Sequence, residues 1–157
     1  MKVILVNGSP HKEGCTYTAL KEVEKELINS GVETEMIWLG VKPVSGCLGC
    51  AQCIKKGPEG EKPTLRCVIN DGVNEFLDKA EQMDGFVFGS PVHYAALSGA
   101  LTSFMDRAFY GKGAIYRYKP AAGIVSARRG GTTAAFDQIN KYFTISSMPV
   151  VSSKYWN

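Results

Sequence analysis

The stretch Lys2-Val3-Ile4-Leu5-Val6-Asn7-Gly8-Ser9-Pro10-His11-Lys12-Glu13-Gly14-Cys15-Thr16 decides the fold prediction. Residues 2–6 form a short, largely apolar run rich in β-branched side chains, which is typical of a strand buried on both faces. Residues 7–15 interrupt that run with glycine, serine and proline, and residues 16–30 then place their apolar side chains on one helical face. A buried strand, a glycine-rich turn and a helix in this order indicate the first unit of a parallel α/β sheet.

The rest of the chain repeats this alternation of apolar runs and helical patterns. Further strands are expected at residues 32–39, 86–88, 121–125 and 149–153, and further helices are expected to begin near Asp71, Ser98 and Gly130. Strands that alternate with helices predict a parallel sheet with helices on both faces and right-handed crossovers. The chain stops soon after residue 153, where such a sheet normally has one more helix. We therefore expect a truncated or incomplete chain, or a partner that covers that face.

The composition fits one ordinary globular domain over residues 1–157. Hydrophobic residues make up 45% and charged residues 21% of the chain, which excludes a disordered tail, a collagen and a coiled coil. The net charge of +3 is small and the basic residues are spread along the chain, so no nucleic-acid partner is expected. No apolar run approaches the roughly 20 residues that span a bilayer. The N-terminus does not resemble a signal peptide, so we expect a cytoplasmic protein without a membrane partner.

Four of the five cysteines lie in one insert, at about residues 40–67, that shows no regular hydrophobic period. These four are Cys47, Cys50, Cys53 and Cys67, whereas Cys15 stands alone in the first turn. An odd count without a secretory signal argues against a disulfide framework, and clustered thiols in a reducing compartment more often bind metal or take part in redox chemistry. Because a long insert without regular structure is usually functional, this insert is a candidate site.

Three loops are expected side by side, because the carboxyl ends of parallel strands meet at the same edge of a sheet. They comprise residues 7–16, 90–94 and 126–132. The first places glycines and hydroxyl side chains at a helix N-terminus, which favours a phosphate. The second presents the flat side chains of His93 and Tyr94, and the third has an arginine pair that suits an anionic or planar ligand. Each loop alone is also consistent with an ordinary turn with a solvated rim, but a mononucleotide with a phosphate and a flat ring would contact all three.

Four motifs occur in order along the chain: Asn-Gly-Ser-Pro-His-x-x-Gly-Cys-Thr at 7–16, Gly-Ser-Pro-Val-His-Tyr at 89–94, Ser-Gly-x-Leu-x-x-Phe-x-Asp-Arg at 98–107 and Ser-Ala-Arg-Arg-Gly-Gly-Thr-Thr at 126–133. Together with the Tyr-Trp-Asn ending, they resemble the NAD(P)H-dependent FMN reductases over essentially the whole chain. This resemblance implies a flavodoxin-like, doubly wound, five-stranded parallel sheet with strand order 2-1-3-4-5 and helices on both faces.

The resemblance also implies the residues of the flavin site. The phosphate of FMN is expected at Ser9, His11, Cys15 and Thr16. The isoalloxazine ring is expected against Pro91, Val92, His93 and Tyr94, with Ser126, Arg128, Arg129, Gly130 and Gly131 on its other edge. The family more often has arginine in place of His11 and asparagine in place of Cys15. Phosphate affinity is therefore expected to depend on backbone amides and Thr16.

The pattern Cys47-x-x-Cys50-x-x-Cys53, followed later by Cys67, resembles the iron–sulfur flavoproteins. Three thiolates at every third position can bind one face of a [4Fe–4S] cluster, and a remote fourth thiolate completes the ligand set. The gap from Cys53 to Cys67 is longer than those flavoproteins usually show. Two alternatives stay open: zinc, which four thiolates also bind in a closed tetrahedral site, and free thiols in a loop.

Together these features predict an FMN-dependent oxidoreductase that takes hydride from NAD(P)H. Arg128, Arg129 and the helix start beside them are expected to stabilise negative charge on reduced flavin, and no side chain is expected to act as a nucleophile or general acid. Electrons would pass to a small molecule or, through the cluster, to a protein partner, and the resemblance implies a homodimer or homotetramer. The alternatives are an electron-transfer flavoprotein with little reductase activity of its own, and a non-catalytic module that holds structural zinc on a flavodoxin-like fold.

Overall fold

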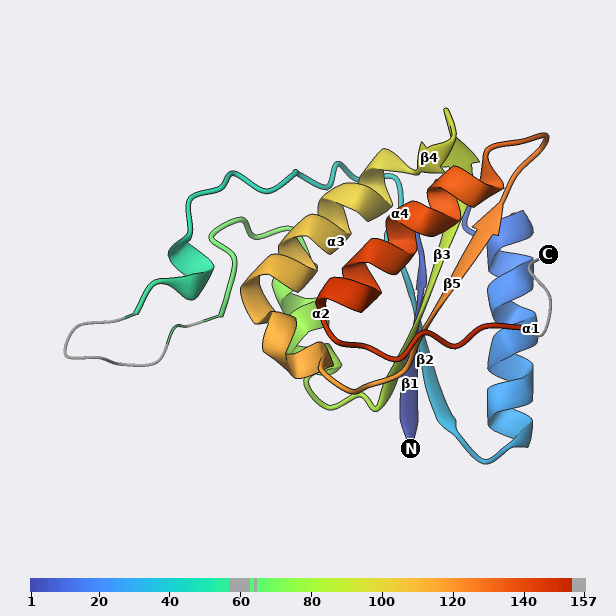
Figure 1. The fold of residues 1–157 in the computed structure, drawn as a ribbon, viewed down its shortest axis with the longest axis horizontal. Helices are drawn as coiled ribbons and strands as arrows, with labels where there is room; N and C mark the ends of the chain where they lie inside the picture. Colours follow the sequence, from blue (N-terminus) through green and yellow to red (C-terminus); the bar gives the residue numbers. More distant parts are fainter. Residues whose placement is uncertain (57–62, 64, 154–157) are drawn as a thin grey trace.

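A parallel β-sheet forms the centre of the structure, a computed structural model that describes residues 1–56, 63 and 65–153 (Figure 1). In spatial order its strands are β2 (Glu33–Trp38), β1 (Lys2–Asn7), β3 (Gly85–His93) and β5 (Ala121–Ser126). Val150 adds a single parallel bridge beside Ala121. The predicted order 2-1-3-4-5 is confirmed, because the chain near residues 121–125 and 149–153 occupies the last two positions.

The fifth strand is shorter than expected. The N–H of Ala121 donates to Pro149 O at 2.9 Å, and the N–H of Val151 donates to Ala121 O at 2.8 Å. Pro149 has no N–H of its own to extend this pairing, and the side chain of Val151 is exposed rather than packed. Residues 154–157, which include the Tyr-Trp-Asn ending, lie outside the described residues.

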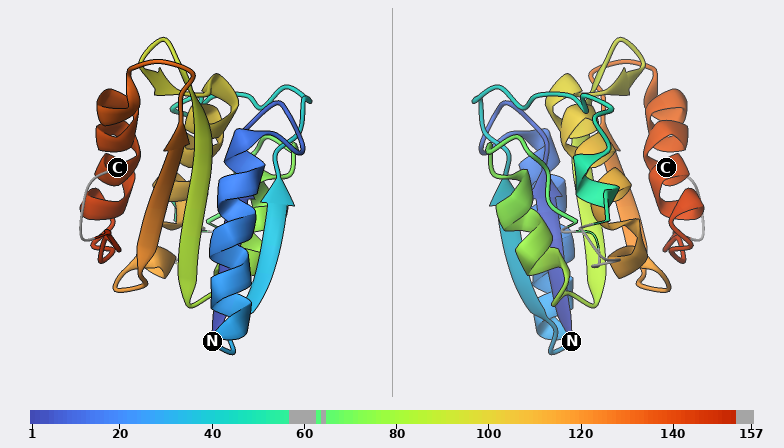
Figure 2. Two further views of the ribbon diagram at one scale, coloured as in Figure 1. Left: turned by 90° about the vertical axis from the view of Figure 1, so that its right-hand side faces the viewer. Right: turned by 90° about the vertical axis from the view of Figure 1, so that its left-hand side faces the viewer.

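Helices cover both faces of the sheet, as expected (Figure 2). One face carries α1 (Cys15–Asn29), and the other carries α2 (Val73–Ala80), α3 (Gly99–Lys112, continued by the 3₁₀ turn η3, Gly113–Tyr116) and α4 (Thr132–Ile145). Val3 and Leu5 pack with residues of α1, while Ile4 and Val6 pack in the larger core beneath the other helices. This division explains why β1 is apolar from Val3 to Val6. Within the described chain, none of the helices is long and apolar enough to cross a membrane.

Strand β3 extends beyond the expected residues 86–88 and turns back on itself. Its end pairs antiparallel with β4 (Ala96–Leu97), with His93 opposite Ala96. The turn residues Tyr94 and Ala95 both adopt left-handed conformations, with φ of 52° and 59°. A two-residue hairpin turn of this kind usually contains Asn or Gly, so a Tyr-Ala pair carries no local signal for it. The second loop is therefore the tip of a hairpin.

The cysteine-rich insert lies between β2 and α2 along the chain. Its described residues contain one short 3₁₀ helix, η1 (Gln52–Ile54). The insert residues 57–62 and 64 lie outside the description. Figure 1 shows the described part reaching outward beyond α2 and α3.

Gly8 lies where β1 ends and is closely surrounded by two other elements. Its N–H donates to Gly89 O at 2.8 Å, and a β-carbon added here would lie 2.7 Å from Leu101 Cβ on α3. Because neither neighbour can move freely, we expect Gly8→Ala to lower the free energy of unfolding by about 1–3 kcal/mol. Urea denaturation measures this change.

Gly99→Ala is the matched control for that variant, because a β-carbon at Gly99 would meet nothing within 4 Å. Alanine is favoured over glycine in a helix by up to about 1 kcal/mol, so this variant should be as stable as the wild type or more stable. Equal unfolding midpoints for the two variants would contradict the close packing of Gly8 against α3.

Candidate functional site

The three expected loops lie side by side at the carboxyl edge of the sheet (Figures 1 and 2). Asn7 at the end of β1 is the register partner of Gly89 in β3. Two residues further along β3, Pro91 is the partner of Ser126 at the end of β5. The first loop is therefore adjacent to the second, and the second is adjacent to the third.

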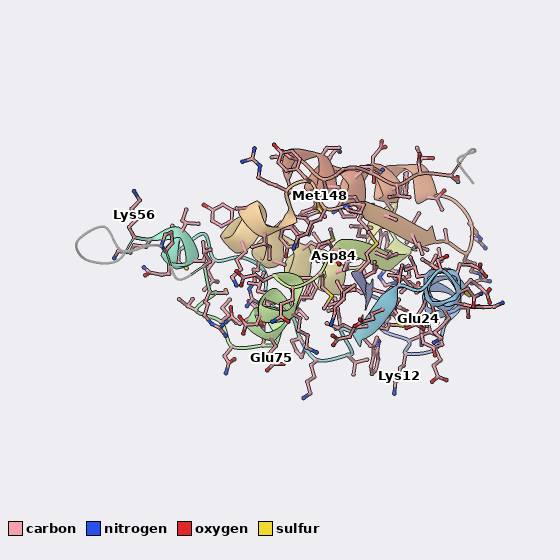
Figure 3. The ribbon with its side chains drawn as sticks, turned by 90° about the horizontal axis from the view of Figure 1, so that it is seen from below. Lys12, Glu24, Lys56, Glu75, Asp84 and Met148 are labelled. Atoms are coloured by element: carbon pink, nitrogen blue, oxygen red, sulfur yellow. The ribbon has the colours of Figure 1, made fainter. Side chains whose placement is uncertain are left out.

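Hydrogen bonds within the first loop hold it in a compact turn. Asn7 Oδ1 accepts the N–H of Ser9 at 3.0 Å, and Asn7 Nδ2 donates to the backbone oxygen of Lys12, which is labelled in Figure 3, at 3.1 Å. Ser9 Oγ accepts the N–H of His11 at 3.1 Å. The Ser9 side chain is buried, whereas that of His11 is exposed. Because the amides of Ser9 and His11 already have partners, an anion bound here would depend on the helix turn that follows.

The first turn of α1 has the features of an anion site. Its N-cap residue Gly14 provides no side-chain cap, and the turn contains no acidic residue. The side chain of Cys15 is exposed, while that of Thr16 is only 2% exposed. Thr16 Oγ1 lies 2.8 Å from Ser126 Oγ, so a hydrogen bond joins the first and third loops. A helix start without a side-chain cap leaves amide N–H groups and partial positive charge for a phosphate.

The second and third loops contact each other through Gly131. This N-cap residue of α4 has a φ of 92°, and a β-carbon added to it would lie 2.8 Å from Ala95 Cα and 3.1 Å from Val92 Cγ1. Like α1, α4 begins without a side-chain cap and without an acidic residue in its first turn. Arg128 and Arg129 are exposed beside this helix start, so their charge is available to a ligand.

The residues expected around a flavin ring form the rim of the hairpin tip. Pro91 and Val92 are half-buried, His93 and Gly130 are exposed, and Tyr94 is fully exposed at the turn. The structure thus gathers the expected flavin residues around one edge of the sheet. Their individual contacts with a flavin stay a prediction.

Two residues that the sequence analysis did not assign to the site also hold the first loop. Trp38 Nε1 donates to Ser9 O at 2.8 Å, and Lys12 Nζ lies 6.0 Å from the centre of the Trp38 ring. Ser98 Oγ donates to Gly8 O at 2.7 Å and accepts the N–H of Leu101 at 3.3 Å. The pattern of a helix cap was visible at Ser98, but nothing local to either residue indicates a contact with the first loop.

The four insert cysteines line one pocket between the insert and α3. Cys53 and Cys67 are half-buried, whereas Cys47 and Cys50 are exposed. Burial raises the pKa of Cys53, a backbone hydrogen bond opposes this rise, and the charges of the other three cysteines add to it. Across the described ranges, no three Cys, His, Asp or Glu side chains are grouped closely enough to hold a metal ion as they stand. The structure thus brings the expected ligands to one pocket without arranging them around a metal, and their ligand role stays a prediction.

Arg107, a buried cation of α3, lines this pocket. Arg107 donates Nε–H to Cys67 Sγ at 3.2 Å and forms an ion pair with the carboxylate of Asp71. Arg107 was not among the site residues predicted from the sequence. One signal could have found it: Arg107 follows Phe104 by three residues, on the apolar face of its helix, where a charge needs a partner.

Comparison with known proteins identifies relatives over the whole chain. The model of the NADPH-dependent FMN reductase family matches residues 1–157. An iron–sulfur flavoprotein of Methanocaldococcus jannaschii is 35% identical over 154 residues, which cover 96% of this chain and 76% of that protein. An iron–sulfur flavoprotein of Archaeoglobus fulgidus is 32% identical over 141 residues, which cover 90% of this chain but only 57% of that protein.

Solved structures of similar fold include an NAD(P)H:quinone oxidoreductase from Methanothermobacter marburgensis. The TM-score is 0.70 at 16% sequence identity, and the alignment covers 97% of this chain and 82% of that chain. At this level of identity the likeness shows the fold.

Proposed function

Because this chain belongs to the NADPH-dependent FMN reductase family, we propose that it binds FMN at the three loops, oxidises NAD(P)H and passes the electrons on through a [4Fe–4S] cluster held by the insert cysteines. The observation that carries the flavin site is the uncapped first turn of α1 beside the Thr16–Ser126 hydroxyl pair. A phosphate is the group that such a helix start suits best, and the flat part of FMN would then extend toward the second and third loops.

The first loop and α1 would hold the phosphate. The N–H groups of the first helix turn and the Thr16 hydroxyl would donate to it, with Ser9, His11 and Cys15 around them. The ring would lie against Pro91, Val92, His93 and Tyr94, with Ser126, Arg128, Arg129, Gly130 and Gly131 along its other edge.

The protein's part in the chemistry would be electrostatic. Bound FMN supplies two-electron hydride chemistry with NAD(P)H and one-electron transfer to a second acceptor. Arg128, Arg129 and the uncapped start of α4 would stabilise negative charge on the reduced ring. No side chain is required as a nucleophile or general acid.

The donor set of the insert fits an iron–sulfur cluster. Four thiols face one pocket, and thiolates are the ligands that such clusters use. Binding would displace the thiol protons and draw the four sulfurs together. The names of the two archaeal relatives support this assignment.

A second candidate is an electron-transfer flavoprotein with little reductase activity of its own. It is favoured by the rim of the cysteine pocket, where the large apolar side chains of Leu48, Val68 and Tyr110 are exposed. Exposed apolar groups around a redox site suit contact with a partner protein. The rate of NADPH oxidation without a protein partner distinguishes this candidate from the first.

The proposed function is tested by an absorption spectrum of anaerobically purified protein, with iron, acid-labile sulfide and zinc assayed on the same sample. We expect flavin bands together with about four iron and four sulfide per chain. Flavin bands without iron would leave an FMN reductase whose insert holds no cluster. Zinc without flavin would favour the non-catalytic module, and a colourless sample that fails to take up FMN would overturn the flavin site.

A further inference from the structure

Arg107 is a buried cation to which the proposed function gives no role. It is 3% exposed, and its guanidinium donates to Ser45 O at 3.1 Å, to Ile69 O at 3.0 Å and to both carboxylate oxygens of Asp71. Burial alone would raise the pKa of Asp71, but the hydrogen bonds and charge of Arg107 outweigh burial and hold that pKa below its usual value. Both Arg107 and Asp71 are therefore charged, and the net charge of the pair is zero.

These bonds attach the backbone on both sides of the four insert cysteines to one residue. Ser45 lies two residues before the first insert cysteine, Cys47, and Ile69 lies two residues after the last, Cys67. Arg107 holds both points on the rigid helix α3. The backbone on either side of the pocket is thus positioned before any ligand arrives.

The same guanidinium also touches a sulfur. Arg107 Nε lies 3.2 Å from Cys67 Sγ, and Asn74 fixes the backbone of Cys67 through two hydrogen bonds of 2.8 Å. A hydrogen bond to a ligand sulfur withdraws electron density from it, which favours the more negatively charged, reduced form of an iron–sulfur centre. Because Asp71 cancels the net charge of Arg107, the directed N–H bond is the main effect that reaches the sulfur.

We propose that Arg107 is the positioning residue of the cysteine site, and that its N–H bond to Cys67 raises the reduction potential of the bound cluster. This inference rests on the proposed function, since it concerns the cluster that the four cysteines would hold. Arg107 sets the potential through Cys67 and sets the shape of the site through Ser45 and Ile69.

The test is a redox titration of the cluster in the anaerobic holoprotein, with the flavin potential read from the same sample. Arg107→Lys keeps the charge opposite Asp71 but loses the planar fork and its Nε–H. We expect the cluster potential to fall by an amount that changes the ratio of reduced to oxidised protein about tenfold, which is about 59 mV for one electron, while the flavin potential stays unchanged. Arg66→Lys is the matched control, because Arg66 precedes Cys67 but forms its ion pair with Asp78 on the surface.

Asp71→Asn provides a second variant with the opposite expected sign. It keeps the N–H groups of Arg107 and removes the compensating charge, so the cluster potential should rise. A loaded Arg107→Lys protein with the wild-type potential would overturn the inference. If Arg107→Lys holds no cluster, the Asp71→Asn variant decides, and a cluster potential equal to that of the wild type in Asp71→Asn would overturn the inference. A wild-type protein that binds no iron would overturn the proposed cluster and this inference together.

Discussion

Thr16→Glu is expected to abolish FMN retention, because it places a carboxylate where the flavin phosphate is proposed to bind. Thr16 is buried in the first turn of α1, and its hydroxyl is bonded to Ser126. Loss of one hydrogen bond to a charged group costs about 1.5–3 kcal/mol, and the repulsion between like charges adds to this cost. We therefore expect FMN affinity to fall at least about a hundred-fold. Flavin content after gel filtration and quenching of FMN fluorescence measure it.

Two variants control this experiment. Thr18→Glu adds the same charge to the exposed face of the same helix, and Thr16→Ser keeps the hydroxyl, so both should retain FMN. If Thr16→Glu does not fold, as judged by circular dichroism, Thr16→Val removes the hydroxyl with little change in volume and should weaken binding about tenfold. Unchanged flavin content in folded Thr16→Glu would exclude the phosphate from the start of α1.

Cys50→Ser should remove the cluster and leave the flavin in place. Cys50 is exposed, so the substitution does not disturb the core, and a serine hydroxyl is a much weaker ligand for an iron–sulfur cluster than a thiolate. We expect iron and acid-labile sulfide to fall to background while FMN content and the unfolding midpoint stay at wild-type values. Metal analysis and the flavin absorption bands of one sample measure both.

Cys15→Ser is the matched control for that variant, because Cys15 is also exposed but lies in the first loop. It should keep the iron and acid-labile sulfide of the wild type. Loss of iron from Cys15→Ser would contradict the assignment of the four insert cysteines as the ligands. Loss of flavin along with iron from Cys50→Ser would show that the two sites do not assemble independently.

The parts of the fold that the sequence predicts well are those set by local patterns. The apolar run of β1, the glycine-rich turn and the helix after it each depend on neighbours within a few positions, and α1 begins at Cys15, within one residue of the expected start. The hairpin tip was not predictable, since Tyr94 and Ala95 adopt a turn that their residue types do not favour. Packing of this tip against Gly131 stabilises that turn.

The candidate site also has one part that the sequence predicts and one part that it does not. The three loops were predictable because parallel strands all end at one edge, and the sequence marks each loop with glycine or proline. The contacts between Arg107, Asp71 and Cys67 span 36 and 40 residues of chain. No hydrophobic period encodes such a contact, so the partner of a buried charge is known only from the folded structure.

Helix α3 connects the two halves of the site. At its start Ser98 holds the first loop through Gly8, and nine residues later Arg107 holds the cysteine-rich insert. At 1.5 Å per residue, these two attachment points stand about 14 Å apart along the helix axis. One residue inserted between them would rotate the guanidinium by about 100° and carry it off the insert, although neither loop would have changed. In the proposed function, the length of this one helix sets how far the phosphate-binding loop stands from the cysteine-rich insert.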